Sequence, residues 1–501
     1  MIQQTAEGTT PMNAPARLDS AHPRRWAILA VLSVAQLMVV LDATVVNIAL
    51  PSAQDALHFS DGSRQWIVTA YALAFGSLLL LGGKLGDLFG RKWTFVTGLL
   101  GFAAASAVGG AAQSFEVLVG ARALQGVFGA LLAPAALSLL TTTFPSGGDR
   151  ARAFGIFGAI AGAGGAIGLL LGGVLTEYLS WRFAMYVNLA FAIPAAVGGI
   201  ALVAHAPHPD RPRFDLPGVF TASGGLFAVV YGLSHAETTS WSNPLTVAFL
   251  VAGIALLGAF AAIQRRSAHP LLPLRVVLDR TRGGSFVAFA ISASGIFGVF
   301  LFLTYYLQQT LGYSPVRTGL AFLPMVAALM VTATLATARL APRFGSRPLV
   351  PAGMLLAAAG MFLLTRLGVD STYAADILPA LLPLGLGMGL IFAPSMSAST
   401  AGVAAHDAGV ASAMVNTTQQ VGGAVGTALL STLFAAAITE YVVTPGGGAA
   451  AQASAAISGY STAFGWATGI FVAGALITAL ILPSGTPAPA PAAELDIAFA
   501  H

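Results

Sequence analysis

The chain has 501 residues, of which 56% are apolar and only 8% are charged, and it contains no cysteine. A soluble domain carries about 25% charged residues, so this composition excludes a water-soluble protein and indicates one that lies in a lipid bilayer. The lack of cysteine excludes disulfides, thiolate metal sites and cysteine nucleophiles. The net charge of +4 is spread too thinly to indicate a nucleic-acid partner.

Fourteen stretches of the chain are long and apolar enough to cross a membrane as helices, which needs roughly 20 mostly apolar residues each. They are 26–50, 66–82, 93–112, 116–141, 152–178, 183–204, 217–235, 245–263, 284–309, 315–338, 348–366, 376–399, 409–440 and 461–482. The sequence therefore predicts an all-α integral membrane protein with 14 transmembrane helices. Residues 1–25 predict a polar tail without a removable signal peptide, and residues 483–501, rich in Pro and Ala, predict a disordered tail.

The distribution of basic residues predicts the orientation of these helices. Of the 23 basic residues, Arg64, Arg182, Arg317 and Arg366 lie on one side, Arg122 lies within a span, and the other 18 lie on the side of the N-terminus. Because cytoplasmic loops are enriched in Lys and Arg, we expect both chain ends in the cytoplasm and the protein in the cell membrane. Arg outnumbers Lys 21 to 2, which indicates a GC-rich bacterial genome.

Two predicted loops, 255 residues apart, carry a similar sequence. Residues 84–92 read KLGDLFGRK and residues 339–347 read RLAPRFGSR, so that Leu, Phe and Gly coincide and both ends are basic. This repeat predicts two six-helix halves, 26–204 and 269–482, with two inserted transmembrane helices in 205–268. Parallel halves around a midplane site are typical of transporters that work by alternating access.

Four segments resemble motifs of one family, the 14-helix drug:proton antiporters of the major facilitator superfamily. They are Leu41–Pro51 (LDATVVNIALP), Gly83–Lys92 (GKLGDLFGRK), Arg122–Gly126 (RALQG) and Gly164–Gly173 (GGAIGLLLGG). The first is specific to this subfamily, and the second marks only the superfamily. In the fourth, Leu169 stands where the family has Pro.

The resemblance implies a major facilitator fold and a secondary active exporter, which moves amphiphilic drug-like or antibiotic molecules out of the cell in exchange for protons. The expected partners are this small-molecule substrate, protons and the lipid bilayer, with no nucleic acid. The proton gradient would drive transport, so no cofactor and no enzymatic activity are expected, and the protein is expected to work as a monomer. Proton-coupled uptake or facilitated transport of a small metabolite, or a membrane sensor or lipid-handling protein, remain as alternatives on the same fold.

Asp42 and Arg122 are the two charged residues predicted to lie deep inside spans. A charge at membrane depth is costly unless it is paired or faces a wet cavity, so it marks a candidate functional site. We expect Asp42 to take a proton from outside. The resemblance implies that Arg122 acts in proton coupling by biasing a carboxyl such as Asp42. The alternatives are an Asp42 that anchors near the outer interface and an Arg122 in the cytoplasmic third, satisfied by loop carbonyls.

The resemblance also implies a gate after the second span. Its residues are Gly83, Asp87, Gly90, Arg91 and Lys92, which would latch the cytoplasmic ends of the two halves together in the outward-facing state. The alternative is an ordinary basic cytoplasmic loop.

The span 152–178 carries a row of glycines at spacings of three and four residues. Gly162, Gly165, Gly168 and Gly172, with Gly173 beside them, form one predicted face. Small residues in such a row let helix backbones touch, so we expect a close contact that seals the cavity.

Substrate contacts are predicted from aromatic and amide side chains within the spans, which suit amphiphilic ligands. The candidates are Trp66, Tyr71, Gln125, Tyr306, Asn416 and Gln420. For each of them, helix packing or an interfacial position is the alternative. In the family that the chain resembles, exporters of cationic drugs often carry a second membrane carboxylate in the C-terminal half. This chain has none within a span there, so the resemblance implies monocations, zwitterions or neutral amphiphiles and not dications. All eight His are predicted in loops or tails, so no metal site is expected.

Overall fold

The computed structural model of the chain describes residues 24–60, 63–144, 147–204, 215–267, 270–400, 403, 408–442 and 449–483. Within these residues every regular element is a helix, as the composition predicts. The two predicted tails lie almost entirely outside the described residues.

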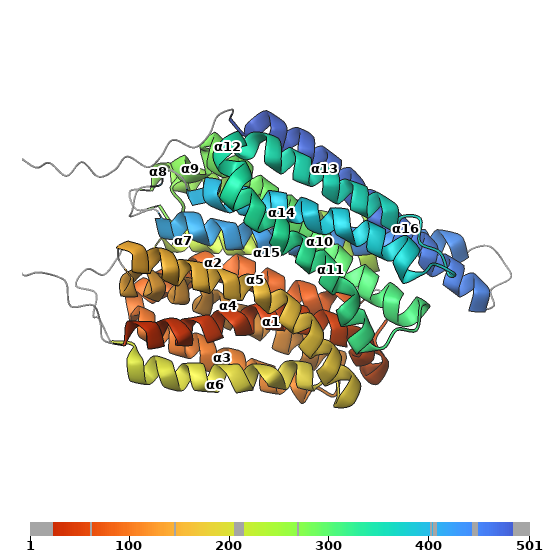
Figure 1. Cartoon of the computed structure of the whole chain (residues 1–501), viewed down its shortest axis with the longest axis horizontal. Helices are drawn as coiled ribbons and strands as arrows, with labels where there is room; N and C mark the ends of the chain where they lie inside the picture. Colours follow the sequence, from red (N-terminus) through yellow and green to blue (C-terminus); the bar gives the residue numbers. More distant parts are fainter. Residues whose placement is uncertain are drawn as a thin grey trace, which may run out of the picture.

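The first bundle, drawn in red to yellow in Figure 1, is built from the helices between residues 25 and 202. They are α1 (Arg25–Leu57), α2 (Gln65–Phe89), α3 (Arg91–Gly110), α4 (Phe115–Thr143), α5 (Gly147–Tyr178) and α6 (Phe183–Leu202). Helix α4 packs on α2 and α3, α1 packs on α5 and α6, and α3 packs on α6.

The second bundle, drawn in green to blue, is built from the long helices that follow residue 280. They are α10 (Arg280–Tyr305), α11 (Pro315–Leu335), α13 (Ser346–Leu364), α14 (Leu378–Thr400), α15 (Ala408–Val442) and α16 (Ala449–Ile481). Short elements flank them: α9 (Leu274–Leu278), α12 (Ala341–Phe344) and the π-helical turns η1 (Tyr306–Thr310), η2 (Ala336–Leu340) and η3 (Tyr373–Ile377). The two bundles meet where α2 packs on α15 and where α5 packs on α11.

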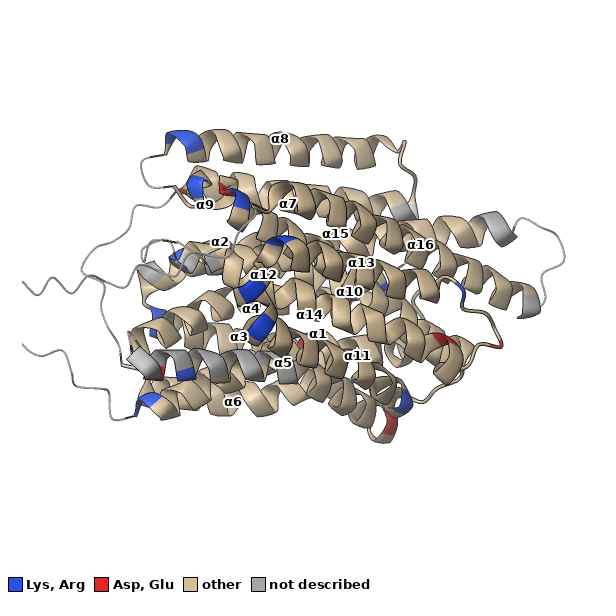
Figure 2. Ribbon diagram, turned by 45° about the horizontal axis from the view of Figure 1, so that its top comes forward, with Lys and Arg blue, Asp and Glu red and all other residues tan. Residues whose placement is uncertain are grey.

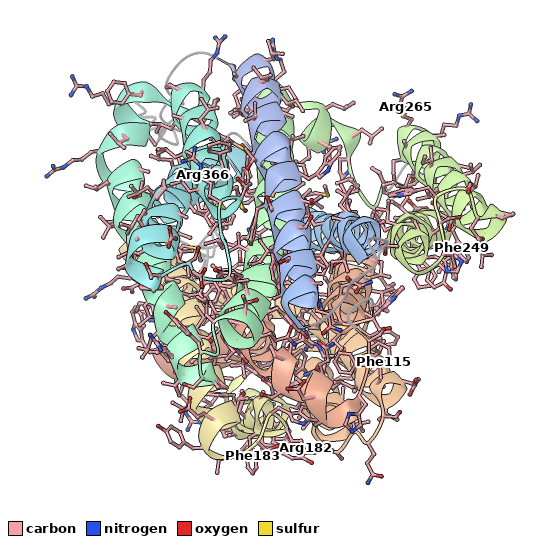
Figure 3. All side chains as sticks on the ribbon, turned by 90° about the vertical axis from the view of Figure 1, so that its right-hand side faces the viewer. Phe115, Arg182, Phe183, Phe249, Arg265 and Arg366 are labelled. Carbon is pink, nitrogen blue, oxygen red and sulfur yellow. The ribbon has the colours of Figure 1, made fainter. Side chains whose placement is uncertain are left out.

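Two further helices, α7 (Leu216–Thr238) and α8 (Pro244–Arg266), connect the bundles in sequence. They pack on each other, and α7 also contacts α2 and α15. Helix α8, which carries the labelled Phe249 and Arg265, lies at the edge of the molecule (Figure 3).

In the described part of the chain, twelve helices are long and apolar enough to cross a membrane. The helices α2 and α5 contribute shorter apolar stretches, Gln65–Leu79 and Gly164–Tyr178. The protein is therefore a multi-pass membrane protein. The total of 14 spans stays a prediction.

Several helices begin at a polar cap, whose side-chain oxygen accepts a hydrogen bond from a backbone N–H that the first helical turn leaves unpaired. These caps are Ser114, Asp215, Asn243, Asp279 and Ser314. Asp279 accepts from two N–H groups, those of Thr281 and Arg282. The caps fix where α4, α7, α8, α10 and α11 start.

Three local predictions need correction. Helix α1 does not end at residue 50 but continues through Pro51 to Leu57, and Asp42 lies near its middle. The segment 83–92 is helical up to Phe89, so that Gly90 alone joins α2 to α3. His235 lies in the last turn of α7, not in a loop.

Gly90 and Gly345 occupy equivalent places in the sequence repeat, and both are single-residue joints between helices. Their φ angles are 89° and 74°, a region in which only glycine is unstrained. The conformational requirement at this joint explains why the glycine recurs in both copies.

The two ends of the helices differ in charge (Figure 2). We call the end at which α1 begins the basic face, because most Lys and Arg ribbon segments lie there. The opposite end, where α1 ends and α2 begins, is the far face, and Figure 3 looks onto it.

Candidate functional site

The centre of the first bundle holds a buried ion pair. Arg122 on α4 donates from Nη1 to Oδ2 of Asp42 on α1, at 2.5 Å. The two residues are 1% and 0% exposed. Taking two charges out of water is costly, and the pair is stable only when the remaining hydrogen-bonding atoms also find partners.

Two amide side chains complete the shell around the carboxylate. Asn188 on α6 donates to Oδ1 of Asp42 at 2.7 Å, and Gln125 donates to the same oxygen at 2.9 Å. The Gln125 amide nitrogen also lies 2.7 Å from Oγ of Ser106 on α3. Asn188, Gln125 and Ser106 are each fully buried. The carboxylate therefore receives hydrogen bonds from three side chains on two helices.

The guanidinium of Arg122 is also held from several directions. Its Nε donates to the carbonyl oxygen of Ile67 at 3.1 Å, and Nη1 donates to Oε1 of Gln125 at 2.9 Å. The ring of Tyr71 lies under the guanidinium carbon at 4.4 Å from the ring centroid. Arg122 lies two turns from the start of α4, toward the far face, so it does not occupy the third of the bundle next to the basic face.

The site is thus a charge pair held by five helices of one bundle, α1, α2, α3, α4 and α6. The ion pair connects α1 to α4, so any change in the charge of either side chain would alter the contact between these two helices.

Sequence reasoning singled out Asp42, Arg122 and Gln125 but missed Asn188 and Ser106. Asn188 is the one amide in a very apolar helix, and this contrast is the signal that could have identified it. Ser106 offers no such signal, because serine is common in membrane helices.

The gate motif is placed at the basic face, at the junction of α2 and α3. Lys92 donates from Nζ to the carbonyl oxygen of Ile200 on α6 at 2.8 Å, a contact within the first bundle. Gly83 lies against Pro134 of α4. The side chain of Asp87 lies outside the described residues, so the latch stays a prediction.

The predicted glycine face contains two kinds of contact and one gap. A Cβ at Gly168 or Gly172 would run into Leu41 to Val45 of α1, and one at Gly173 would lie 2.8 Å from Pro315 and Val316 of the second bundle. Nothing lies within 4 Å of the Cβ position at Gly165, so this glycine is not part of the contact. The surroundings of Gly162 are outside the described side chains.

The six candidate substrate contacts do not form one cluster. Gln125 contacts Asp42 and Tyr71 contacts Arg122. Trp66 instead lies against Tyr231 of α7, with ring centroids 5.8 Å apart. Tyr306 is fully buried and donates to the carbonyl oxygen of Gly368 at 2.7 Å.

Asn416 and Gln420 lie on α15, and Gln420 packs against Gly76 of α2. Two cavities of about 450 and 410 Å³ lie in the described structure, and neither is lined by any of the six residues. The substrate contacts stay a prediction.

No group of three or more His, Asp or Glu that could hold a metal ion occurs among the described residues. The fold and the buried pair define a multi-pass membrane protein with an ion pair buried inside one of its two bundles.

Comparison with known proteins identifies the family. Residues 32–427 match the Major Facilitator Superfamily, and the chain belongs to it. It is 50% identical over 475 residues to the puromycin resistance protein of Streptomyces alboniger, covering 94% of each chain. It is 38% identical to the cephamycin export protein of Amycolatopsis lactamdurans (80% of this chain, 83% of that one).

A multidrug efflux pump of Mycolicibacterium smegmatis is 34% identical over 86% of this chain and 85% of its own. Among solved structures, a bacterial homologue of the human lysosomal transporter Spinster has a TM-score of 0.67 at 16% identity, covering 92% and 97% of the two chains. The chain is thus a membrane transporter of the drug-efflux type and not an enzyme, as the motifs predicted.

Proposed function

We propose that this protein exports amphiphilic organic molecules of the antibiotic type in exchange for protons, and that Asp42 carries the proton. The observation that supports this most directly is the fully buried Asp42–Arg122 pair. An ionisable pair at membrane depth is typical of proton relays in transporters. The relatives with resistance and export functions support the direction of transport.

In our proposal, proton movement is coupled to transport because a proton neutralises Asp42. When Asp42 is ionised, Arg122 ties α4 to α1. When Asp42 is protonated, the ion pair is lost and Arg122 keeps only its contacts to Ile67, Gln125 and Tyr71. A ligand shifts a conformational equilibrium only by the difference in its affinity for the two states. A proton on Asp42 meets this condition because it changes the interaction between two helices.

We propose that the basic face lies in the cytoplasm, in line with the enrichment of Lys and Arg in cytoplasmic loops. Protons would then enter from the far face, toward which Arg122 is displaced. Because the pair and both bundles come from one chain, we propose a functional monomer.

We infer the substrate class from the kinds of polar side chain that the second bundle buries. In the described residues of the second bundle, the buried polar side chains are Ser and Thr hydroxyls and Tyr, with no carboxylate. Such walls suit neutral molecules, zwitterions and monocations. Puromycin is the first compound to test, because it appears in the name of a relative that is 50% identical.

The test uses inverted membrane vesicles with an acidic interior and a dye that reports the proton gradient. Adding an exported compound should partly collapse the gradient in vesicles with the wild-type protein. Asp42→Asn should abolish this response. Asp376→Asn is the matched control, because this partly buried carboxylate lies outside the charge pair and caps a turn by accepting from Thr372 N–H.

Three outcomes would contradict parts of the proposal. A response of Asp42→Asn equal to the wild type would remove Asp42 from coupling. Transport without any change in the proton gradient would indicate a facilitator. A panel in which no compound is transported would favour a sensor or lipid-handling protein.

A further inference from the structure

The far face contains a second buried cation, Arg64, which the coupling site does not use. Arg64 precedes α2 and is 2% exposed, although it lies in the connection between two helices. Its guanidinium carbon lies 4.0 Å from the ring centroid of Tyr305, 4.8 Å from that of Phe434 and 6.0 Å from that of Phe302. We call these three rings the aromatic cage.

The cage belongs to the other bundle. Tyr305 and Phe302 are in the last turn of α10, and Phe434 is in α15. The rings are rigidly held, because Phe302 and Phe434 stack at 5.2 Å and all three are at most 5% exposed. A cation over an aromatic face is attracted most strongly when both are removed from water. The side chain of Arg64 thus bridges from the first bundle into a prepared site on the second.

The far face is closed around this contact. Gln308 donates from Nε2 to the carbonyl oxygen of Ile48 at 3.0 Å, across the two bundles. Glu177 of α5 accepts a hydrogen bond from the backbone N–H of Val316 of α11 at 2.9 Å. Any movement that parts the bundles at this face must also withdraw Arg64 from the cage.

We propose that Arg64 and the aromatic cage form a latch that holds the far face shut, so that the strength of this cation–π contact sets how often the face opens. The proposal rests on alternating access, which is part of the proposed function. Arg64 acts here as a positioning residue that controls the conformational equilibrium, and it does not contact the proton site. Because Arg cannot lose its charge, the latch is released by movement and not by titration.

The chain contains no cysteine, so a single introduced thiol can report opening without background. Leu169→Cys is suitable, because Leu169 is fully buried where α5 meets α11 and its carbonyl oxygen faces Gly319. The rate at which a maleimide labels this thiol measures the population in which the two helices have parted. This measurement needs neither a substrate nor a proton gradient, so it tests the latch independently of the exported compound and of proton coupling.

In this background, Arg64→Gln should raise the labelling rate by about tenfold or more, because a desolvated cation–π contact is lost. Phe434→Leu, which keeps an apolar side chain but removes the ring, should also raise the rate. The double variant should add little to Arg64→Gln alone, since both changes remove one interaction. Arg64→Lys keeps the charge and should have a smaller effect.

Arg182→Gln is the matched control. Arg182 also lies on the far face, with its guanidinium over Trp181 at 4.7 Å, but it donates to the carbonyl oxygens of Gly110 and Ala112 within its own bundle. Its loss should leave the labelling rate unchanged. A second reporter, Leu99→Cys, is fully buried inside the first bundle and detects general unfolding.

The latch is overturned if Arg64→Gln labels Leu169→Cys no faster than Arg182→Gln does. It is also overturned if Arg64→Gln accelerates labelling of Leu99→Cys to the same extent. The change would then loosen the whole fold and not only the contact between the two bundles. Failure of gradient-driven export in the wild type, with the latch effect intact, would overturn the proposed function and leave the latch standing.

Discussion

The two bundles share a helical architecture but differ in what they bury. Among the described residues, the buried charged side chains are Asp42, Arg64 and Arg122, and all three belong to the first bundle or to the connection before α2. The buried polar side chains of the second bundle are hydroxyls, and its core is rich in aromatic rings. In our proposal, this difference places the proton-dependent step in the first bundle, while the second bundle contributes apolar and aromatic surfaces, including the aromatic cage.

The largest effect should come from breaking the charge pair. Arg122→Met leaves the Asp42 carboxylate buried and unpaired, which should cost about 3–5 kcal/mol of unfolding free energy. Adding Asp42→Asn should restore most of this loss, because no unpaired charge remains. Denaturant unfolding in detergent measures both effects.

The control in the second bundle is Arg317→Met. Arg317 lies exposed over the ring of Tyr313 at 3.8 Å, so its loss should cost less than about 1 kcal/mol. Equal losses for Arg122→Met and Arg317→Met would contradict the assignment of buried charge to the first bundle.

Asn188→Ala should have the next largest effect. It removes a 2.7 Å hydrogen bond to a buried carboxylate, which is worth about 1.5–3 kcal/mol. Ser292→Ala, which removes only a local bond to the Ala288 carbonyl in the second bundle, should cost less. The comparison is read from the same unfolding titrations. A larger loss at Ser292 would count against a special role for the amide shell.

Glycine contacts should matter equally in both bundles. A Cβ at Gly172 would lie 2.9 Å from the Cα of Val45, and one at Gly426 would lie 2.4 Å from the Cα of Ser294. Each Ala substitution should cost roughly 1–3 kcal/mol through overpacking. Gly165→Ala, which meets nothing within 4 Å, should instead stabilise the helix by about 0.5–1 kcal/mol. Destabilisation by Gly165→Ala would refute this reading of the glycine face.

Among the losses of a buried hydrogen bond, the smallest effect is expected at Tyr306. Tyr306→Phe removes the hydroxyl that donates to Gly368 and should cost about 0.5–1.5 kcal/mol. We expect drug export by this variant to stay close to the wild-type rate in whole-cell efflux assays. A severe loss of export without a loss of stability would indicate that Tyr306 contacts the substrate.

Rare residue types allowed the centre of the site to be predicted from the sequence. Asp42 and Arg122 stand out because charges are so scarce in the spans, and the structure places them in contact across 80 positions of sequence. Asn188 lies 146 residues from Asp42. No periodic pattern in one helix indicates which side chain of another helix will face it, so this contact depends on the packing of the whole bundle.

Helix ends and the seam between bundles were harder to predict. Proline is tolerated within membrane helices, so Pro51 gave no reliable end for α1. Arg64 lies between two predicted spans, and no pattern in the sequence indicates that its side chain is buried. Its burial depends on rings more than 230 positions away, and this information lies only in the assembled fold.

The proposed role of Asp42 is tested by an experiment that separates proton coupling from drug movement. Proteoliposomes that contain the wild type or Asp42→Asn would be assayed for drug exchange without a gradient and for uphill export driven by an imposed proton gradient. We expect Asp42→Asn to retain exchange and to lose uphill export, because the binding path is intact while residue 42 can no longer change its charge. Uphill export by Asp42→Asn at the wild-type rate would contradict it.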